Sequence, residues 1–171
     1  MDNVYKIKKK LKIPMAMATI ASIPVFIDVI TQNQDQSVQF MAVLLMVIFY
    51  LLTINNILRK FVISDNEVSI RGLLGVKKIP INEITIIDAV IMGSRQFVSI
   101  SNKKQNFLIS NSYDDFPGLV EAVEKIAPEG TLGEGFKSLK GNIIERKSDV
   151  AGAWIAVILL LIIMLIRFYP K

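Results

Sequence analysis

The stretch FVISDNEVSIRGLLGVKKIPINEITII, residues 61–87, decides the fold of this chain. Apolar and polar residues alternate in it, which is typical of β-strands with one buried face. In the segment EVSIR, the pattern predicts that Val68 and Ile70 point inward. Asp65 and Asn66 separate this segment from FVIS and predict a two-residue hairpin turn, because both residue types tolerate a positive φ.

The same pattern continues beyond this first hairpin. Residues 72–75, GLLG, predict the next connection, and Pro80 indicates an edge strand or a strand end, since proline cannot donate to a ladder. Runs rich in β-branched residues follow at 84–92, 95–101 and 106–110, separated by short polar turns. The sequence therefore predicts six strands with short connections.

After these strands the apolar period changes from that of a strand to that of a helix. Asp114 or Asp115 can cap the helix, and Pro117 is tolerated in its first turn. One apolar stripe follows, made of Phe116, Leu119, Val120, Val123 and Ile126. The prediction is an α+β domain over 59–127, an antiparallel meander closed by one amphipathic helix.

The order Asp65-Asn66, Arg71-Gly72, Ile79-Pro80 and Ile84 resembles the opening of bacterial pleckstrin-homology-like (PH-like) domains of the membrane-bound type. The resemblance covers about residues 60–127 and implies an antiparallel β-sandwich or barrel with a C-terminal capping helix. In lipid-binding eukaryotic relatives, basic residues of the first hairpin hold the phosphates. Here that hairpin is Ser-Asp-Asn-Glu, so phosphoinositide binding is not expected.

Hydrophobic residues make up 52% of the 171 residues and are concentrated near the two ends. Three apolar runs, at 13–30, 38–58 and 151–168, have about the length of 20 residues that crosses a bilayer as a helix. The first two are joined by seven polar residues, 31–37, which predicts a transmembrane helical hairpin over 13–58. The third run predicts a third transmembrane helix.

Basic residues set the expected orientation. Residues 1–12 form a basic N-terminus with five lysines, Lys6, Lys8, Lys9, Lys10 and Lys12. Arg59 and Lys60 follow the second apolar run, whereas the connection between the first two runs has no basic residue. The N-terminus and the PH-like domain are therefore expected in the cytoplasm of a bacterial cell, with the chain multi-pass in the cell membrane. The lysines would also attract anionic lipid, by about 1 kcal/mol per charge.

Three further features carry expectations. Asp28 is an ionisable residue inside an apolar run, and either an interfacial position or a role in ion or proton handling would explain it. Residues 128–150 are rich in glycine and charge and predict a flexible tether, with an amphipathic piece around 136–144 on the bilayer as the alternative. Residues 59–150 hold 13 basic and 12 acidic residues, so the domain is expected to attract anionic surfaces only weakly.

The composition also limits the chemistry. The chain has no cysteine and no histidine, which excludes thiol chemistry, Cys/His zinc sites and histidine-dependent triads. No catalytic residue, cofactor, metal or nucleic-acid partner is expected, and the chain is not expected to be an enzyme. The leading hypothesis is a membrane-anchored interaction or scaffold module that binds a protein partner or a second copy of itself. The alternative is a small integral-membrane transport or channel component, with Asp28 in a functional position.

Overall fold

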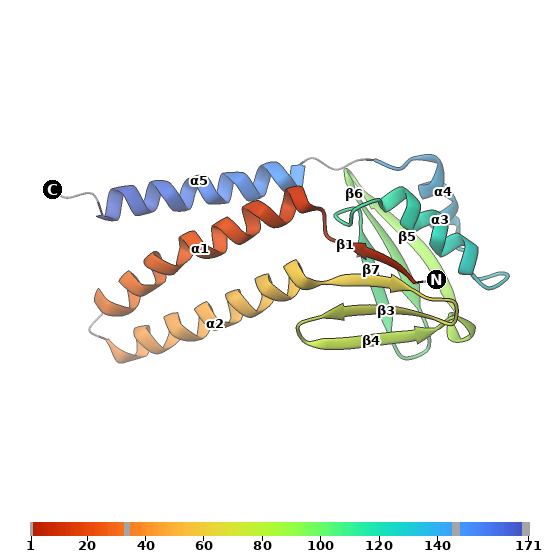
Figure 1. The fold of residues 1–171 in the computed structure, drawn as a ribbon, viewed down its shortest axis with the longest axis horizontal. Coiled ribbons are helices and arrows are strands. Elements are labelled where there is room, and N and C mark those ends of the chain that lie inside the picture. The colour runs from red at the N-terminus through yellow and green to blue at the C-terminus, as the bar shows by residue number, and fades with distance from the viewer. Residues whose placement is uncertain (1, 33–34, 145–147, 169–171) are drawn as a thin grey trace. The chain divides into compact units, whose positions relative to one another are not determined.

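The computed structural model describes residues 2–32, 35–144 and 148–168 as an α+β chain (Figure 1). The chain divides into two compact units. Met1–Lys8 and Leu58–Arg146 form the first unit, which we call the domain. Lys9–Ile57 and Lys147–Lys171 form the second, which contains the apolar helices.

The domain contains two antiparallel sheets, and a strand lies at each of the six predicted positions. One sheet has the order β1-β2-β3-β4 and the other has the order β5-β6-β7. The strands are β1 (Asn3–Lys6), β2 (Lys60–Ile63), β3 (Glu67–Gly72), β4 (Gly75–Pro80), β5 (Ile86–Met92), β6 (Arg95–Ser101) and β7 (Asn106–Ser110). As expected from Pro80, β4 is an edge strand that ends at this proline.

The additional strand, β1, comes from the N-terminus and pairs antiparallel with β2, with Lys6 opposite Lys60 (Figure 1). The predicted basic N-terminus, 1–12, is therefore divided between the domain and the first apolar helix. Four residues, NVYK, are too few to show a strand period. Because β1 and β2 flank α1 and α2 in the chain, the two-helix segment is an insertion within the first sheet rather than a segment that precedes the domain.

Helix α3 (Phe116–Ile126) contributes the predicted stripe to the core. Phe116, Leu119, Val120 and Val123 are all buried with residues of both sheets. Asp115 is the N-cap, and its side chain accepts a hydrogen bond from the backbone N–H of Gly118 at 3.1 Å. The apolar period and the cap residue thus placed this helix correctly from sequence.

The tether predicted over 128–150 is wrong for residues 128–144. Helix α4 (Glu134–Gly141) buries Phe136 and Leu139 in the same core as α3. Before it, Ile87 of β5 donates its N–H to the carbonyl of Thr131 at 2.8 Å, and Gly133 donates its N–H back to Ile87 at 2.8 Å. The alternative of an amphipathic piece on the bilayer also fails, because Phe136 and Leu139, on its apolar face, are buried inside the domain. Residues 145–147 lie outside the described residues.

The first hairpin turn differs from the predicted type. Among the described non-glycine residues, only Asp115 has a positive φ, so Asp65 and Asn66 do not adopt the left-handed geometry. The turn is closed by the N–H of Ser64, which donates to the carbonyl of Glu67 at 2.9 Å. Positive φ appears instead at Gly75, next to the β3–β4 turn, and at Gly93, in the β5–β6 turn.

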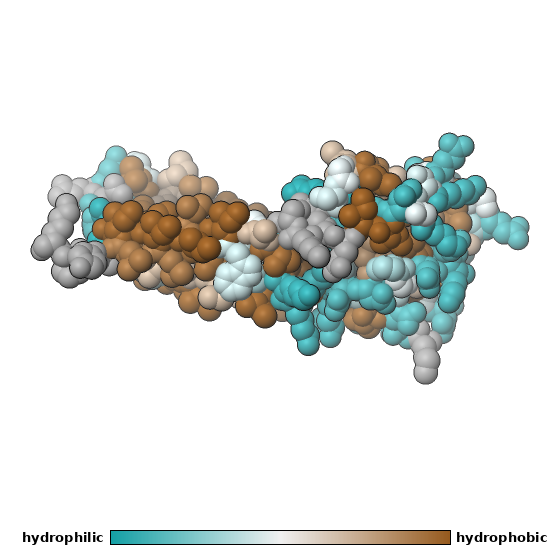
Figure 2. Space-filling view, turned by 90° about the horizontal axis from the view of Figure 1, so that it is seen from above, coloured by the Kyte–Doolittle hydropathy of each residue, from teal (hydrophilic) through white to brown (hydrophobic). Residues whose placement is uncertain are grey.

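The second unit contains α1 (Lys9–Gln32), α2 (Gln36–Leu58) and α5 (Ser148–Phe168). All three are long and apolar enough to cross a membrane. Figure 2 shows hydrophobic residues covering these helices, while hydrophilic residues dominate the visible face of the domain. Each helix extends a few residues beyond the apolar run that predicted it.

Candidate functional site

The structure divides the five predicted lysines between the two units. Lys6 lies in β1 with its side chain exposed, and Lys8 donates its backbone N–H to the carbonyl of Ser112 at 3.0 Å. Lys9, Lys10 and Lys12 lie in the first turns of α1. The lysines therefore do not form one cluster, and Lys6 has a basic neighbour that comes from another strand, Lys60.

Asp28 of α1 has a charged partner on α5. Its Oδ2 lies 2.7 Å from Nε of Arg167. Gln32 donates from Nε2 to Oδ1 of Asp28 and accepts from Nη2 of Arg167, so the three side chains form a closed polar cluster. The Asp28 side chain is 12% exposed and that of Arg167 is 51% exposed.

The position of this cluster accounts for two isolated charges. Asp28 and Arg167 both lie within the last turn or so of their helices, α1 and α5. From the sequence, Asp28 was considered without a charged partner. The sequence did contain a signal for this pair, because Asp28 and Arg167 carry opposite charges near the C-terminal ends of two apolar runs. Sequence alone does not show which of the three helices are neighbours.

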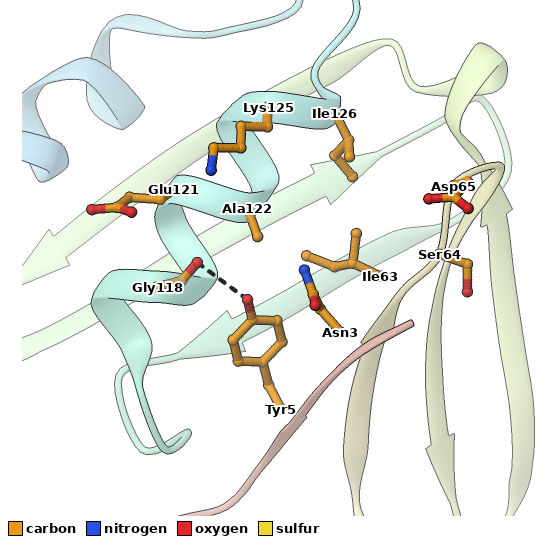
Figure 3. A pocket seen from close by; sticks show the side chains of 10 residues that line it. All are labelled: Asn3, Tyr5, Ile63, Ser64, Asp65, Gly118, Glu121, Ala122, Lys125 and Ile126. Atoms are coloured by element: carbon orange, nitrogen blue, oxygen red, sulfur yellow. Dashed lines mark hydrogen bonds between the residues drawn. The ribbon is translucent and has the colours of Figure 1, made fainter. Parts of the chain in front are cut away.

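The domain has a hollow of about 250 Å³ between β1, the β2–β3 turn and α3 (Figure 3). We call it the β1–α3 pocket. Asn3 and Tyr5 line it from β1, and Glu121 and Lys125 line it from α3. The other lining residues are Ile63, Ser64, Asp65, Gly118, Ala122 and Ile126. Polar and apolar side chains are thus mixed in one concave surface.

Tyr5 connects the two sides of this pocket. Its phenol donates a hydrogen bond to the carbonyl of Gly118 at 3.2 Å (Figure 3). Burial raises the pKa of the Tyr5 phenol above its usual value, and the carboxylates of Asp115 and Glu121 raise this pKa further. Tyr5 therefore keeps its proton at neutral pH and remains a donor. Sequence analysis missed this pocket because it did not place β1 in the domain.

Within the described ranges, no three acidic, histidine or cysteine residues are placed to hold a metal ion. Comparisons with protein-family models, curated proteins and solved structures found no match to this chain.

Proposed function

We propose that the chain is a membrane-anchored interaction module whose PH-like domain binds a protein partner through the β1–α3 pocket. The observation that carries the proposal is the pocket itself. Its volume, about 250 Å³, is below the range of about 300–1,000 Å³ typical of small-molecule sites. A hollow of that size suits one or two side chains of a protein partner. Its lining offers the Lys125 ammonium, the Asp65 and Glu121 carboxylates and the Asn3 amide.

The order of elements supports the PH-like assignment. A four-stranded and a three-stranded antiparallel sheet are followed by a helix that buries one apolar stripe between them. In this reading α3 is the capping helix and the apolar pair α1–α2 is inserted between the first and second strands. The insertion keeps the order of strands and helix, because both of its ends join neighbouring strands of one sheet.

Photocrosslinking of the full chain in native membranes tests the partner. A photoreactive residue at Lys125, which lines the pocket, is compared with the same residue at Lys137, an exposed position on α4. We expect a specific covalent adduct from position 125 and none from position 137. An adduct that contains a second copy of the chain would identify self-association. Equal adducts at the two positions, or none at position 125, would contradict the proposal.

We further propose that the module sits in a bacterial cell membrane with its domain in the cytoplasm. The support is the lysine and arginine distribution together with three helices of membrane-spanning length. Because the chain has no cysteine, single cysteines report topology directly. A cysteine at Ser37 is expected to react with an impermeant reagent on intact cells, whereas one at Ser101 is expected to be protected. Protection of both, or reaction of both, would contradict this topology.

A second candidate function is a small transport or channel component. The observation that favours it is the Asp28, Gln32 and Arg167 cluster, because ionisable groups within membrane helices often mark ion or proton pathways. Proton and ion flux through vesicles containing the full chain tests it. Flux that is abolished by Asp28→Asn and retained in Thr31→Val would favour transport over the interaction module.

A further inference from the structure

One end of the domain carries the residues next to α1 and α2 in the chain, together with Ile144, the last described residue before α5. We call it the joined end. In the first sheet, Lys60 begins β2 two residues after Leu58, the last residue of α2, and Arg71 of β3 lies directly opposite Lys60. The β3–β4 turn, Leu73-Leu74, continues beyond Arg71 in the direction opposite to β2. That turn is therefore at the same end of the sheet as the residues that connect α2 to β2.

The second sheet brings another hairpin to the same end. Asn111 donates from its side-chain amide to the carbonyls of Ser94 and Ile144, at 3.0 and 3.1 Å. The next residue, Ser112, accepts the backbone N–H of Lys8. The β5–β6 turn, which contains Ser94, thus lies on the same side of the domain as Lys8, which precedes α1, and Ile144.

The tips of these two hairpins are apolar and exposed. Leu73 and Leu74 are 46% and 75% exposed, and Ile91 and Met92 are 40% and 65% exposed. Exposed turns are usually built from glycine, proline, asparagine, aspartate and serine. Leu73, Leu74, Ile91 and Met92 are not part of the hydrophobic core of the domain. Groups of exposed apolar residues often mark an interaction surface.

Basic residues form a row behind these tips. Lys6, Lys60 and Arg71 lie directly opposite one another on three adjacent strands, so their side chains share one face of the sheet. All three are exposed, and Arg95 adds a fourth exposed cation at the β5–β6 turn. The exposed carboxylate of Asp114 flanks this row, since its backbone N–H donates to the carbonyl of Lys6. The near balance of charge over the domain therefore conceals a basic end.

The length of the chain limits how far this row can lie from the membrane helices. Lys6 is three residues before the start of α1, and Lys60 is two residues after the end of α2. An extended chain advances about 3.3 Å per residue, so the Cα atoms of Lys6 and Lys60 lie within about 10 Å of the helix ends next to them in the chain. The headgroup layers of a bilayer occupy a comparable depth on each side of the hydrocarbon core.

We propose that the joined end docks onto an anionic lipid surface. The tips Leu73-Leu74 and Ile91-Met92 enter the interface, and Lys6, Lys60, Arg71 and Arg95 contact lipid phosphates. This inference rests on the membrane anchoring in the proposed function, and it is independent of the β1–α3 pocket. The recognised chemistry is a layer of anionic headgroups over hydrocarbon, with no selectivity for one headgroup.

Depth-dependent fluorescence quenching tests the docking. The full chain carries a single cysteine with an environment-sensitive fluorophore and is reconstituted into phosphatidylcholine vesicles containing phosphatidylglycerol and brominated lipids. The probe is placed at Leu74, at Asp65 in the β2–β3 turn as the matched control tip, or at Phe40 in α2 as the membrane control. We expect several-fold stronger quenching at position 74 than at position 65, together with strong quenching at position 40.

Charge variants then test the basic row. With the probe at position 74, Arg71→Glu is expected to reduce quenching in anionic vesicles, whereas Lys103→Glu in the β6–β7 turn is expected to leave it unchanged. Equal quenching at positions 74 and 65, with strong quenching at 40, would overturn the docking and leave the membrane anchor standing. Weak quenching at all three positions would overturn both. An unchanged signal in Arg71→Glu would overturn the role of the cations.

Discussion

The two ends of the domain are built from similar hairpins but from different residues. At the far end, the β2–β3 turn is Asp65-Asn66, and the β6–β7 turn runs from Asn102 to Gln105. Both turns contact the short helix η1 (Ile81–Glu83): the Asn102 side chain donates to Glu83 at 3.2 Å, and the carbonyl of Asn66 accepts the backbone N–H of Ile81 at 2.9 Å. These side chains are wholly or partly accessible to water.

The joined end has the opposite arrangement, with apolar side chains on its surface and polar side chains in its interior. The hairpin tips are apolar and exposed, whereas two amide side chains beneath them, Gln96 and Asn111, are buried. Gln96 accepts from the N–H of Ile144 at 2.9 Å and donates to the carbonyl of Asn142. A turn needs residues that tolerate its backbone geometry, which the far end satisfies with polar residues. At the joined end Gly75 and Gly93 meet this need, so the backbone geometry does not require the apolar residues beside them.

The largest expected effect comes from α4, the helix that leads to Asn142 and Ile144, the backbone partners of the buried amides. Phe136→Ala removes a fully buried ring from α4, and we expect the free energy of unfolding of the domain to fall by about 3–5 kcal/mol. Hydrogen exchange of the β6 amides, measured on the full chain in detergent micelles, reports this loss as faster opening.

The matched control for this variant is the neighbouring Lys137→Ala, an exposed position where we expect a change within about 0.5 kcal/mol. If Phe136→Ala behaved like Lys137→Ala, residues 128–144 would be a tether after all, and Gln96 and Asn111 would not be held by Asn142 and Ile144.

A smaller loss of stability is expected from removing one polar side chain at each end, and the two losses can be compared directly. Asn111→Ala removes a buried amide together with its two hydrogen bonds to the carbonyls of Ser94 and Ile144, and we expect a loss of about 2 kcal/mol. Asn102→Ala at the far end also removes hydrogen bonds, to Glu83 and from Lys104 and Gln105, but water can replace most of them. We expect a loss of about 0.5–1 kcal/mol there. Similar losses for the two variants would show that the ends do not differ in the burial of their polar groups.

Local patterns predicted most of the domain from sequence. The period-2 runs located β2 to β7, and Asp115, Pro117 and the apolar stripe located α3. Length and apolar continuity located the three membrane-length helices. Each of these signals lies within a single element, so no knowledge of the neighbouring elements was needed.

The features that sequence did not predict depend on contacts between distant residues. β1 is four residues long and becomes a strand because β2, separated from it by 53 residues, offers an edge. α4 reads as glycine-rich and charged, and it is ordered by two buried side chains. The pairing of Asp28 with Arg167 joins residues 139 positions apart. Such features follow from the topology, which single-sequence patterns do not contain.

Tyr5 offers a test of β1 with a smaller effect. Tyr5→Phe removes the hydrogen bond to Gly118 but keeps the ring, and we expect the domain to lose about 1 kcal/mol. The raised pKa of the Tyr5 phenol means that folding favours its protonated form. Its contribution is therefore complete below its unfolded pKa, about 10, and is lost as pH rises through the higher folded pKa.

The pH dependence distinguishes this role from simple packing. From neutral pH to above pH 10, wild type is expected to lose more stability than Tyr5→Phe, as measured by hydrogen exchange corrected for its intrinsic pH dependence. Parallel losses would show that the Tyr5 phenol does not titrate with unfolding. Tyr113, whose pKa is also raised by burial, is unchanged in this variant and serves as the internal reference.

The smallest change in stability is expected at the exposed hairpin tips, where the surfaces of the two ends differ most. Replacing Leu73 by Asn and Leu74 by Gly gives the joined end a polar tip like that of the far end. Because both leucine side chains are exposed and Gly75 already provides the positive φ next to the turn, we expect the unfolding free energy to change by about 0.5 kcal/mol or less. The same double variant should lose the lipid docking proposed for the joined end. If it instead lost well over 1 kcal/mol in hydrogen exchange, the leucines would be stabilising the fold, and the difference between the two ends would be one of packing rather than of membrane contact.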